Sequence, residues 1–477
     1  MRRILRFVPP GTTLARMLDT SKQDRPRLVI AGTHSGSGKT SVVTALLSAL
    51  TCRGISVQPF KVGPDYIDPA FHTFVTGVPS RNLDSWLLEA AVLRGLFQKH
   101  APAKGHGVSI IEGVMGLFDG KGATHEGSTA HVAELLTCPV VLVISASGLS
   151  RSAAAMVMGY ASFHPGARVA GVICNRIKTE HQYALIKESV ERECGIPCLG
   201  YLPENPDFSL GSRHLGLVPA GEVANLAAKA AALGKAAAAT IDLEALLALA
   251  ENAPLVESAP LPPVPGPFRV RLGVARDEAF SFYYQDNLDL LQAMGAECVP
   301  FSPMRDAALP QNIHGLYFGG GFPEVFGAAL ADNGAMRMAV RNAVRGGLPV
   351  YAECGGMAYL CASLTDADGR EHQMTGVFPE SVAMTGKLQR FGYATAEFLE
   401  DTVLAPAGAR VRVHEFHYSR LVPASDTGCL QLRKDEGTAW RDGLRLSNVL
   451  ACYPHIHFYA NTALAADFLA CCAKAAP

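Results

Sequence analysis

The stretch that decides the fold is Gly32-Thr33-His34-Ser35-Gly36-Ser37-Gly38-Lys39-Thr40. It lies between two apolar runs, at residues 28–31 and 42–50, which is typical of a strand, a glycine turn and a helix. Such glycines let successive backbone N–H groups point at phosphate oxygens, and the start of the helix adds positive potential. Lys39 then reaches the β- and γ-phosphates, and the Thr40 hydroxyl reaches Mg²⁺. The sequence therefore predicts an ATP site with four binding residues: Gly36, Gly38, Lys39 and Thr40.

One position of this loop departs from the strict phosphate-binding pattern. The pattern has glycine at position 33, where this chain has Thr33 with Gly32 just before it. A chance glycine-rich turn is the alternative interpretation. The strand before the loop, the helix after it and the intact Gly-Lys-Thr at 38–40 favour the phosphate site.

A Mg–ATP site also needs carboxylates at the ends of neighbouring strands. Glu112 follows an apolar strand, and we expect it to hold the metal together with Thr40. Asp65 and Asp68 follow another strand, and Asp119 lies in a glycine-bounded loop. Each of them alone is more often a turn or cap residue. Their gathering after three strands beside a phosphate loop favours a functional role.

A second reactive site is predicted far along the chain, at Ala352-Glu353-Cys354-Gly355-Gly356-Met357. A cysteine between an acidic residue and two glycines, directly after an apolar strand, suits a strained turn that exposes the sulfur. Gly355 leaves backbone N–H groups free to bind an oxyanion. An upstream glycine turn is expected to supply a second donor and to hold an amino-acid substrate, through Gly320 and Gly321.

A reactive thiolate needs a base, and four histidines lie late in the chain: His414, His417, His455 and His457. His455 and His457 follow an apolar run at 449–451, so they are expected near a strand end, as Cys354 is. In strand alternation the two side chains share a face, and the residues alone leave both open as the base.

Composition sets further limits. A chain of 477 residues is too long for one ordinary core, so two or three domains are expected. Hydrophobic residues make up 49% and charged residues 18%, as in a soluble globular enzyme. Because 42 Lys and Arg nearly cancel 43 Asp and Glu, no global field recruits nucleic acid or an anionic membrane. No apolar run is long enough to span a membrane, so a cytoplasmic location is expected.

The 12 cysteines have neither a disulfide framework's density nor the spacing of a zinc site, and most are expected to be reduced, buried thiols. Strand-like and helical runs alternate, which predicts parallel sheets wrapped by helices, and an Ala-rich helical stretch is expected at 220–250. The expected domains are an N-terminal extension, an ATP-binding domain, a stiff Pro-rich linker and a second α/β domain, at residues 1–26, 27–252, 253–268 and 269–470.

The strands are expected at 28–31, 56–61, 109–112, 140–145, 169–175, 269–275, 315–318, 349–352, 411–416 and 448–453. Further motifs stand between and after the two reactive loops, in a fixed order, at residues 63–69, 81–84, 112–120, 213–217, 275–284, 319–324 and 415–419. With these motifs, from residue 27 to about 468, the chain closely resembles the cobyrinate a,c-diamide synthase family, which includes hydrogenobyrinate a,c-diamide synthases.

The resemblance implies a dethiobiotin-synthetase-like P-loop domain followed by a triad-type (class I) glutamine amidotransferase domain. It implies ATP-dependent amidation of the a- and c-carboxylates of cobyrinate in cobalamin biosynthesis, with glutamine or ammonia as the nitrogen donor. The expected partners are ATP with Mg²⁺, L-glutamine and a corrin macrocycle, and a homodimer is kept open as the assembly. Hydrogenobyrinate and nickel sirohydrochlorin are the alternative macrocycles.

The resemblance also assigns residues. It makes Cys354 the nucleophile and His455 the base, while position 457 is His where most triad relatives carry a carboxylate. It places the acyl phosphate beside Asp65, Tyr66, Ile67, Asp68 and Asp119. A partition-type ATPase with a non-catalytic second domain is a more distant alternative. His34 argues against it, because that group carries a second lysine there.

Overall fold

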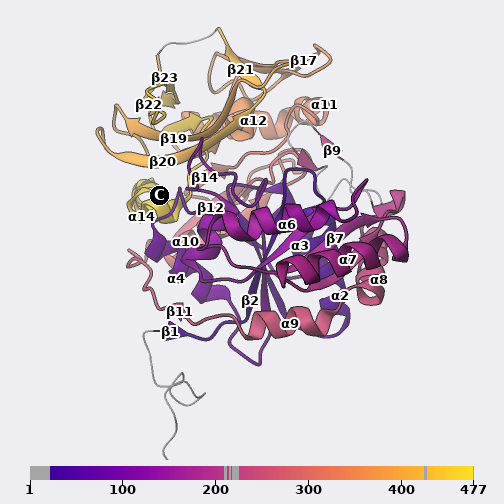
Figure 1. Cartoon of the computed structure of the whole chain (residues 1–477). Coiled ribbons are helices and arrows are strands. Elements are labelled where there is room, and N and C mark those ends of the chain that lie inside the picture. Colours follow the sequence, from indigo (N-terminus) through magenta and orange to yellow (C-terminus); the bar gives the residue numbers. More distant parts are fainter. Residues whose placement is uncertain (1–21, 209–211, 214–215, 218–224, 424–426, 476–477) are drawn as a thin grey trace, which may run out of the picture.

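The computed structural model describes residues 22–208, 212–213, 216–217, 225–423 and 427–475. Residues 1–21 of the expected N-terminal extension lie outside this part of the chain, as do residues 214–215 of the motif at 213–217. Two α/β bodies pack against each other (Figure 1). The first, indigo to magenta, lies below in that view, and the second, orange to yellow, lies above.

The first body is built on a seven-stranded sheet of order β4-β3-β5-β2-β6-β7-β8, in which every pair of neighbours is parallel. Its central strands are apolar and buried, as expected of a parallel sheet covered on both faces. The strands are β2 (Arg27–Gly32), β3 (Val57–Val62), β4 (Arg81–Leu83), β5 (Val108–Glu112), β6 (Val140–Ser145), β7 (Val169–Ile177) and β8 (Cys198–Pro203).

Helices cover both faces of this sheet: α2 (Lys39–Cys52), α3 (Ile67–Thr76), α4 (Ala90–His100), α5 (Thr129–Leu135), α6 (Ser152–Phe163), α7 (Glu180–Cys194), α8 (Leu226–Thr240) and α9 (Leu243–Glu251). Two short strands, β9 (Ser212–Arg213) and β10 (Gly216–Leu217), pair with each other. The five strands predicted in this region match β2, β3, β5, β6 and β7 within two residues at either end. The short edge strand β4 and strand β8 were not predicted.

The Ala-rich stretch predicted to be helical at 220–250 forms two helices in its described part, α8 and α9. Between α8 and α9 the chain is extended at Ile241, which forms a bridge with Gly200 of β8. Asp242 then caps the next helix, because its Oδ1 accepts the backbone N–H of Ala245 at 2.9 Å. Pairing with the sheet and a new cap therefore separate the two helices at Thr240-Ile241-Asp242, where the helix propensity is weaker than in the Ala-rich runs on either side.

The second body contains a six-stranded sheet of order β13-β12-β14-β15-β25-β24, parallel except for β24. Its strands are β12 (Val270–Ala275), β13 (Ala296–Phe301), β14 (Gly315–Phe318), β15 (Val350–Glu353), β24 (Leu444–Leu446) and β25 (Val449–Cys452). Its helices are α10 (Gln285–Ala293), α11 (Gly327–Asp332), α12 (Gly334–Arg345), α13 (Gly355–Leu360) and α14 (Thr462–Lys474).

Two further four-stranded sheets lie at the top of Figure 1, β17-β16-β18-β21 and β20-β19-β22-β23. Their strands are β16 (Ser363–Thr365), β17 (Glu371–Gln373), β18 (Ser381–Met384), β19 (Arg390–Phe398), β20 (Arg410–His417), β21 (Ser419–Val422), β22 (Leu430–Arg433) and β23 (Ala439–Asp442). The strand predicted at 411–416 is β20, but it belongs to the second of these, an antiparallel sheet, and not to an alternating α/β unit. Strand follows strand here without an intervening helix, so the expected alternation is wrong for this region.

The Pro-rich segment at 253–268 is held against the first body. Its strand β11 (Val256–Glu257) pairs antiparallel with β1 (Lys22–Gln23), so the end of the predicted extension is attached as well. Leu261 packs so closely on Gly95 of α4 that a Cβ there would lie 2.8 Å from the leucine Cδ2. The segment therefore packs along the surface of the first body.

Two expectations from composition are met. All twelve cysteines are free thiols, and seven of them are buried: Cys138, Cys174, Cys198, Cys361, Cys429, Cys452 and Cys472. Within the described ranges, the structure contains no helix with the length and apolar character needed to cross a membrane.

Candidate active sites

The phosphate loop joins β2 to α2. Gly36 and Gly38 have φ angles of +83° and +91°, a region that favours glycine. A Cβ at Gly38 would also lie 1.8 Å from Nδ2 of Asn175, which donates to the Ser37 carbonyl at 3.1 Å. Thr33 needs no such freedom, because its φ is not positive and its N–H donates to the Val143 carbonyl. The departure from the strict pattern therefore leaves the loop intact.

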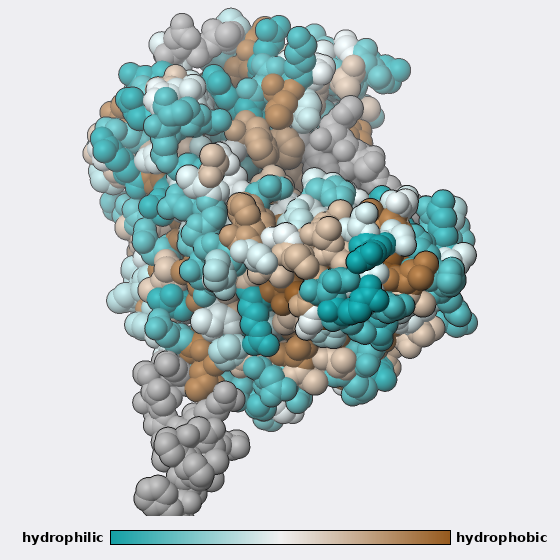
Figure 2. Space-filling view, in the orientation of Figure 1, coloured by the Kyte–Doolittle hydropathy of each residue, from teal (hydrophilic) through white to brown (hydrophobic). Residues whose placement is uncertain are grey.

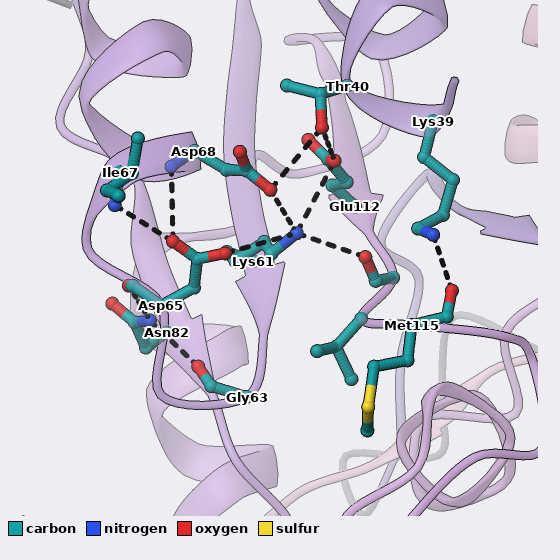
Figure 3. Close-up of polar contacts among 12 residues, drawn as sticks. Lys39, Thr40, Lys61, Gly63, Asp65, Ile67, Asp68, Asn82, Glu112 and Met115 are labelled. Carbon is teal, nitrogen blue, oxygen red and sulfur yellow. Dashed lines mark hydrogen bonds and ion pairs between the residues drawn. The ribbon is translucent and has the colours of Figure 1, made fainter. Parts of the chain in front are cut away.

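Lys39 is the first residue of α2 and its side chain is buried (Figure 3). Its Nζ donates to the carbonyl of Met115, which lies on the loop after β5. Burial, and secondarily the charge of Lys61, lowers the pKa of Lys39 to about 8, although nearby carboxylates act in the opposite direction. The ammonium therefore lies between the phosphate loop and the loop after β5.

Thr40 lies beside the carboxylates expected to organise the metal. Its hydroxyl donates to Oε1 of Glu112 at 2.7 Å and lies 3.4 Å from Oδ2 of Asp68. Glu112 ends β5 and Asp68 lies in the first turn of α3, which follows β3, so neighbouring parallel strands bring them together. These three oxygen donors are the kind that Mg²⁺ prefers, and the residues present therefore fit that ion.

Lys61 lies at the centre of Figure 3 and was missed by the sequence reasoning. This buried residue of β3 forms ion pairs with Asp68, with Glu112 at 3.4 Å and with Asp65 at 3.6 Å. Burial disfavours the ammonium, but the three carboxylates outweigh it and raise the pKa of Lys61 above its ordinary value. A lysine at the end of a strand, directly before an acidic loop, was the available signal.

His72 was also missed, and it holds the other oxygen of Glu112. Its Nε2 lies 2.6 Å from Glu112 Oε2, and its Nδ1 lies 3.1 Å from Ser80 Oγ. Burial would raise the pKa of Glu112, but Lys61 and His72 reverse this and lower it below its ordinary value. The Glu112 carboxylate therefore stays ionised although it is buried away from water. No sequence motif marks His72, because its role arises when α3 packs on α2 and β3 and brings its side chain to the end of β5.

The remaining predicted substrate residues fall into two groups. Asp65, Tyr66, Ile67 and Asp68 line one large cavity with the phosphate loop. Asp65 also accepts the N–H groups of Ile67 and Asp68, at 2.8 and 3.2 Å, which stabilises the start of α3. Asp119 instead accepts the N–H of Gly116 at 2.9 Å within a turn, and it is absent from the described residues that line the cavity.

Cys354 lies at the turn from β15 to α13. Its φ of +48° is unusual for a residue with a side chain, and it fits the strained turn expected for an exposed sulfur. Its N–H donates to the Cys452 carbonyl at 2.7 Å. A Cβ at Gly355 would lie 3.1 Å from the N atom of Gly321, and one at Gly320 would lie 2.6 Å from Cε1 of His455. The structure thus brings the three predicted glycines, the cysteine and one histidine together.

His455 is buried beside Cys354. Burial disfavours the imidazolium, but hydrogen bonds and charge interactions with Cys354 and Glu353 raise the pKa of His455 to about 10. Its Nδ1 lies 3.3 Å from Oε2 of Glu353, whose Oε1 accepts from the Tyr351 hydroxyl at 2.6 Å and the Ile456 N–H at 3.2 Å. Glu353 occupies the orienting position of a triad, although it directly precedes the nucleophile.

His457 lies apart from the thiol, so the expectation that it shares a face with His455 is wrong. The chain leaves the sheet after Cys452, and His455 makes only an isolated bridge with His414. His457 then begins a 3-10 turn, with Nδ1 accepting the Tyr459 N–H at 3.3 Å. Burial lowers the pKa of His457 to about 4. It likewise lowers the pKa of His414 and His417, to about 3 and 4.

Tyr66 joins the two sites. It comes from the loop beside the phosphate site, yet its ring stacks on Phe282 at 5.1 Å and lies 5.2 Å from the ring of His455. One cavity of about 1560 Å³ runs from the phosphate loop to Cys354 and His455. Ligand pockets usually measure about 300–1,000 Å³, so this one has room for more than one reactant.

Comparisons with known proteins divide the chain into the same two parts. The family model for a CobQ/CobB/MinD/ParA nucleotide binding domain matches residues 28–218, and that for a CobB/CobQ-like glutamine amidotransferase domain matches residues 271–463. A solved structure of a glutamine amidotransferase aligns with 42% of this chain and 98% of its own, at 16% identity. Its TM-score is 0.31.

Full-length relatives are closer in sequence. A cobyrinate a,c-diamide synthase of Listeria innocua is 44% identical over 92% of this chain and 97% of its own length. A cobyrinate a,c-diamide synthase of Caldanaerobacter subterraneus is 44% identical over 90% of this chain and 95% of its own length. The domain matches and these relatives show an ATP-dependent ligase that takes its nitrogen from glutamine, built from a P-loop domain and an amidotransferase domain. The chain belongs to the cobyrinate a,c-diamide synthase family.

Proposed function

We propose that the protein amidates the a- and c-carboxylates of cobyrinate, using ATP and glutamine, in cobalamin biosynthesis. One observation carries this proposal: the phosphate loop and the Cys354–His455 pair open into the same cavity, with Tyr66 between them. Ammonia released at the thiol can then reach an activated carboxylate without leaving the protein. Cobyrinate is preferred because the relatives above carry its name. Hydrogenobyrinate and nickel sirohydrochlorin are the alternative macrocycles.

The first half-reaction releases ammonia. The Cys354 thiolate attacks the side-chain amide carbon of glutamine, and backbone N–H groups at Gly355 and the glycine turn at 320–321 offset the developing oxyanion. The His455 imidazolium gives its proton to the leaving ammonia, and the imidazole then activates the water that hydrolyses the thioester. Glu353 holds Nδ1 of His455, which leaves Nε2 for the reacting groups.

The second half-reaction consumes ammonia. A macrocycle carboxylate attacks the γ-phosphate of ATP, which forms an acyl phosphate and releases ADP, and Lys39 offsets the charge on the transferring group. Mg²⁺ held by Thr40 and Glu112, with Asp68 beside them, would neutralise phosphate oxygens. The loop at residues 65–68 lies next to this point, where the acyl phosphate is expected. Ammonia then displaces phosphate and leaves the amide, and a second round amidates the other carboxylate.

The proposed function is tested by offering the purified protein each of the three macrocycles with ATP and glutamine, and by following the products by mass. Cobyrinate should gain two amides, each consuming one ATP. If hydrogenobyrinate or nickel sirohydrochlorin alone is amidated, the macrocycle assignment is wrong. If none is amidated, even with ammonia in place of glutamine, the proposed reaction itself is wrong.

His455→Ala should suppress glutamine hydrolysis and slow the labelling of Cys354 by a thiol-directed glutamine analogue. The raised pKa of His455 keeps the imidazolium charged below about pH 10, so at neutral pH it stabilises the thiolate, and this partner is lost in the variant. His457→Ala should retain more of both activities, because that side chain packs against Tyr284. Both variants should retain ammonia-dependent amidation. Greater damage from His457→Ala would reverse the assignment of the base.

Glu353→Gln should lower glutamine hydrolysis by at least about tenfold, because the amide keeps the size of the side chain but removes the charge that stabilises the imidazolium and replaces one acceptor oxygen by a donor. Without that charge, the pKa of His455 should fall from its raised value. The alkaline limb of the hydrolysis pH profile should therefore move to lower pH. A rate loss with an unmoved pH profile would mean that Glu353 acts only through packing.

A further inference from the structure

We propose that the macrocycle binds between the two bodies, with its flat face against aromatic side chains of the antiparallel sheet β20-β19-β22-β23. This inference rests on the proposed function and extends it, since the residues assigned so far to the substrate lie on the ATP-binding body. Four residues of β19 and β20 line the shared cavity and form this aromatic wall: Phe391, Tyr393, His414 and Phe416.

The expected position of the nucleotide does not overlap the aromatic wall. The phosphate loop fixes the phosphates at the start of α2, and one end of the cavity beyond it is lined by Asn175, Arg176 and residues 202–206, at the carboxyl ends of β7 and β8. Arg176 also donates to the Gly36 carbonyl at 3.1 Å, so this end continues directly from the loop. The nucleoside fits there. The opposite end, toward β19 and β20, then remains for the second substrate.

The wall has the chemistry of a stacking surface. Phe391 is 49% exposed although it faces a cavity, and the ring of Phe416 lies 5.0 Å away at a steep angle. Figure 2 shows hydrophobic residues gathered in the hollow between the upper and lower bodies. Water contact with such a surface is unfavourable, and a large conjugated macrocycle would remove it.

The ATP-binding body packs against the same face of the sheet at the Tyr393 end of the wall, so the wall is fixed when both bodies are in place. Tyr393 donates from its hydroxyl to Asp84 Oδ2 at 2.8 Å, and its ring lies 4.7 Å from that of Trp86. Arg412 of β20 donates to the Trp86 carbonyl at 2.9 Å. A Cβ at Gly127 would lie 3.2 Å from the Tyr393 ring, so the loop before α5 also packs there.

Two lysines at the rim supply the matching charge. Lys121 and Lys434 both line the cavity, one from each body. Lys121 lies 4.6 Å over the Trp86 ring and pairs with Asp435, and Lys434 lies 3.9 Å from Glu436. Both acidic partners are largely exposed, so a substrate carboxylate can take their place at little cost. A corrin carries further carboxylates around its edge besides the two that react, and these lysines suit them.

The test is Phe391→Ala in ammonia-dependent amidation. Loss of the stacking surface should raise the KM for the macrocycle by about tenfold, because an aromatic contact of this kind is worth about that factor in affinity. The KM for ATP should change far less. Phe391→Trp should restore the wild-type value, since it keeps a flat ring. Met338→Ala is the matched control, because Met338 is 62% exposed on α12 and lines no part of this cavity.

Direct binding gives a second readout. The chain has two tryptophans, and both lie on this sheet or against it: Trp440 in β23 and Trp86 beneath Tyr393. A macrocycle on the wall should quench their fluorescence, and Phe391→Ala should weaken that binding by the same factor as it raises KM. If wild-type protein amidates a macrocycle while Phe391→Ala keeps its KM and binding, this inference alone is wrong. If wild-type protein binds and amidates none of the three macrocycles, the inference and the proposed function both fail.

Discussion

Lys39→Ala should abolish amidation with glutamine and with ammonia alike, lowering the rate by at least about 10³-fold. Phosphoryl transfer relies almost wholly on positioning and on neutralising charge, and a single cation at the transferring group is worth about this much. Lys39 is buried at the start of α2, beside Thr40 and the carboxylates that would hold Mg²⁺. Initial rates with saturating macrocycle and either nitrogen source measure the effect.

The control for Lys39→Ala is Lys187→Ala, which removes an exposed lysine of α7 that forms a surface ion pair. It should leave both rates near wild type. Glutamine hydrolysis should survive in Lys39→Ala, because Cys354 and His455 lie on the other body. Near-normal amidation with ammonia in Lys39→Ala would mean that the loop at 32–40 is not the ATP site.

Cys354→Ala should remove glutamine-dependent amidation and leave ammonia-dependent amidation largely intact. Without the sulfur there is no nucleophile to capture the amide, whereas the phosphate loop lies on the other body and keeps all its groups. Hydrolysis of glutamine should fall by at least about 10³-fold, as for the loss of a nucleophile in other enzymes with this logic. The two assays, run on one preparation, separate the half-reactions.

Cys52→Ala is the matched control for Cys354→Ala, because Cys52 is an exposed thiol at the end of α2. It should keep both activities. Thermal unfolding should confirm that Cys354→Ala is folded, since the alanine keeps a Cβ and must adopt the same strained positive φ without the contacts of the sulfur. Loss of ammonia-dependent activity in a folded Cys354→Ala protein would show that the two sites do not divide the work as proposed.

The parts of the sites that the sequence predicts are those formed by local backbone chemistry. A glycine turn between an apolar strand and a helix can adopt few shapes, and Gly36 and Gly38 have the positive φ angles that the phosphate loop needs. The same holds for the turn at Cys354, where two glycines follow the strained residue. Most parallel strands were also predictable, because buried strands are continuously apolar.

What escaped prediction depends on contacts between distant segments. Lys61 and Glu353 stand beside local motifs and His72 belongs to none, but all three acquire their roles from contacts with distant segments. His457 was misplaced because the chain leaves β25 before reaching it. The antiparallel sheet with β20 was missed because its strands lack the alternating helices expected from the rest of the domain. Local periodicity does not report which sheet a strand joins.

The ring of Tyr66 reaches from one body into the active site of the other, where Phe282, Tyr284 and His455 surround it. The amidotransferase half would therefore lack this ring at its active site if it were made as a separate polypeptide. Two such halves would have to meet by diffusion, and the yield of working enzyme would fall with dilution. Covalent connection replaces that encounter with a fixed local concentration. A single chain thus keeps the release of ammonia and its use in step at any abundance of the protein.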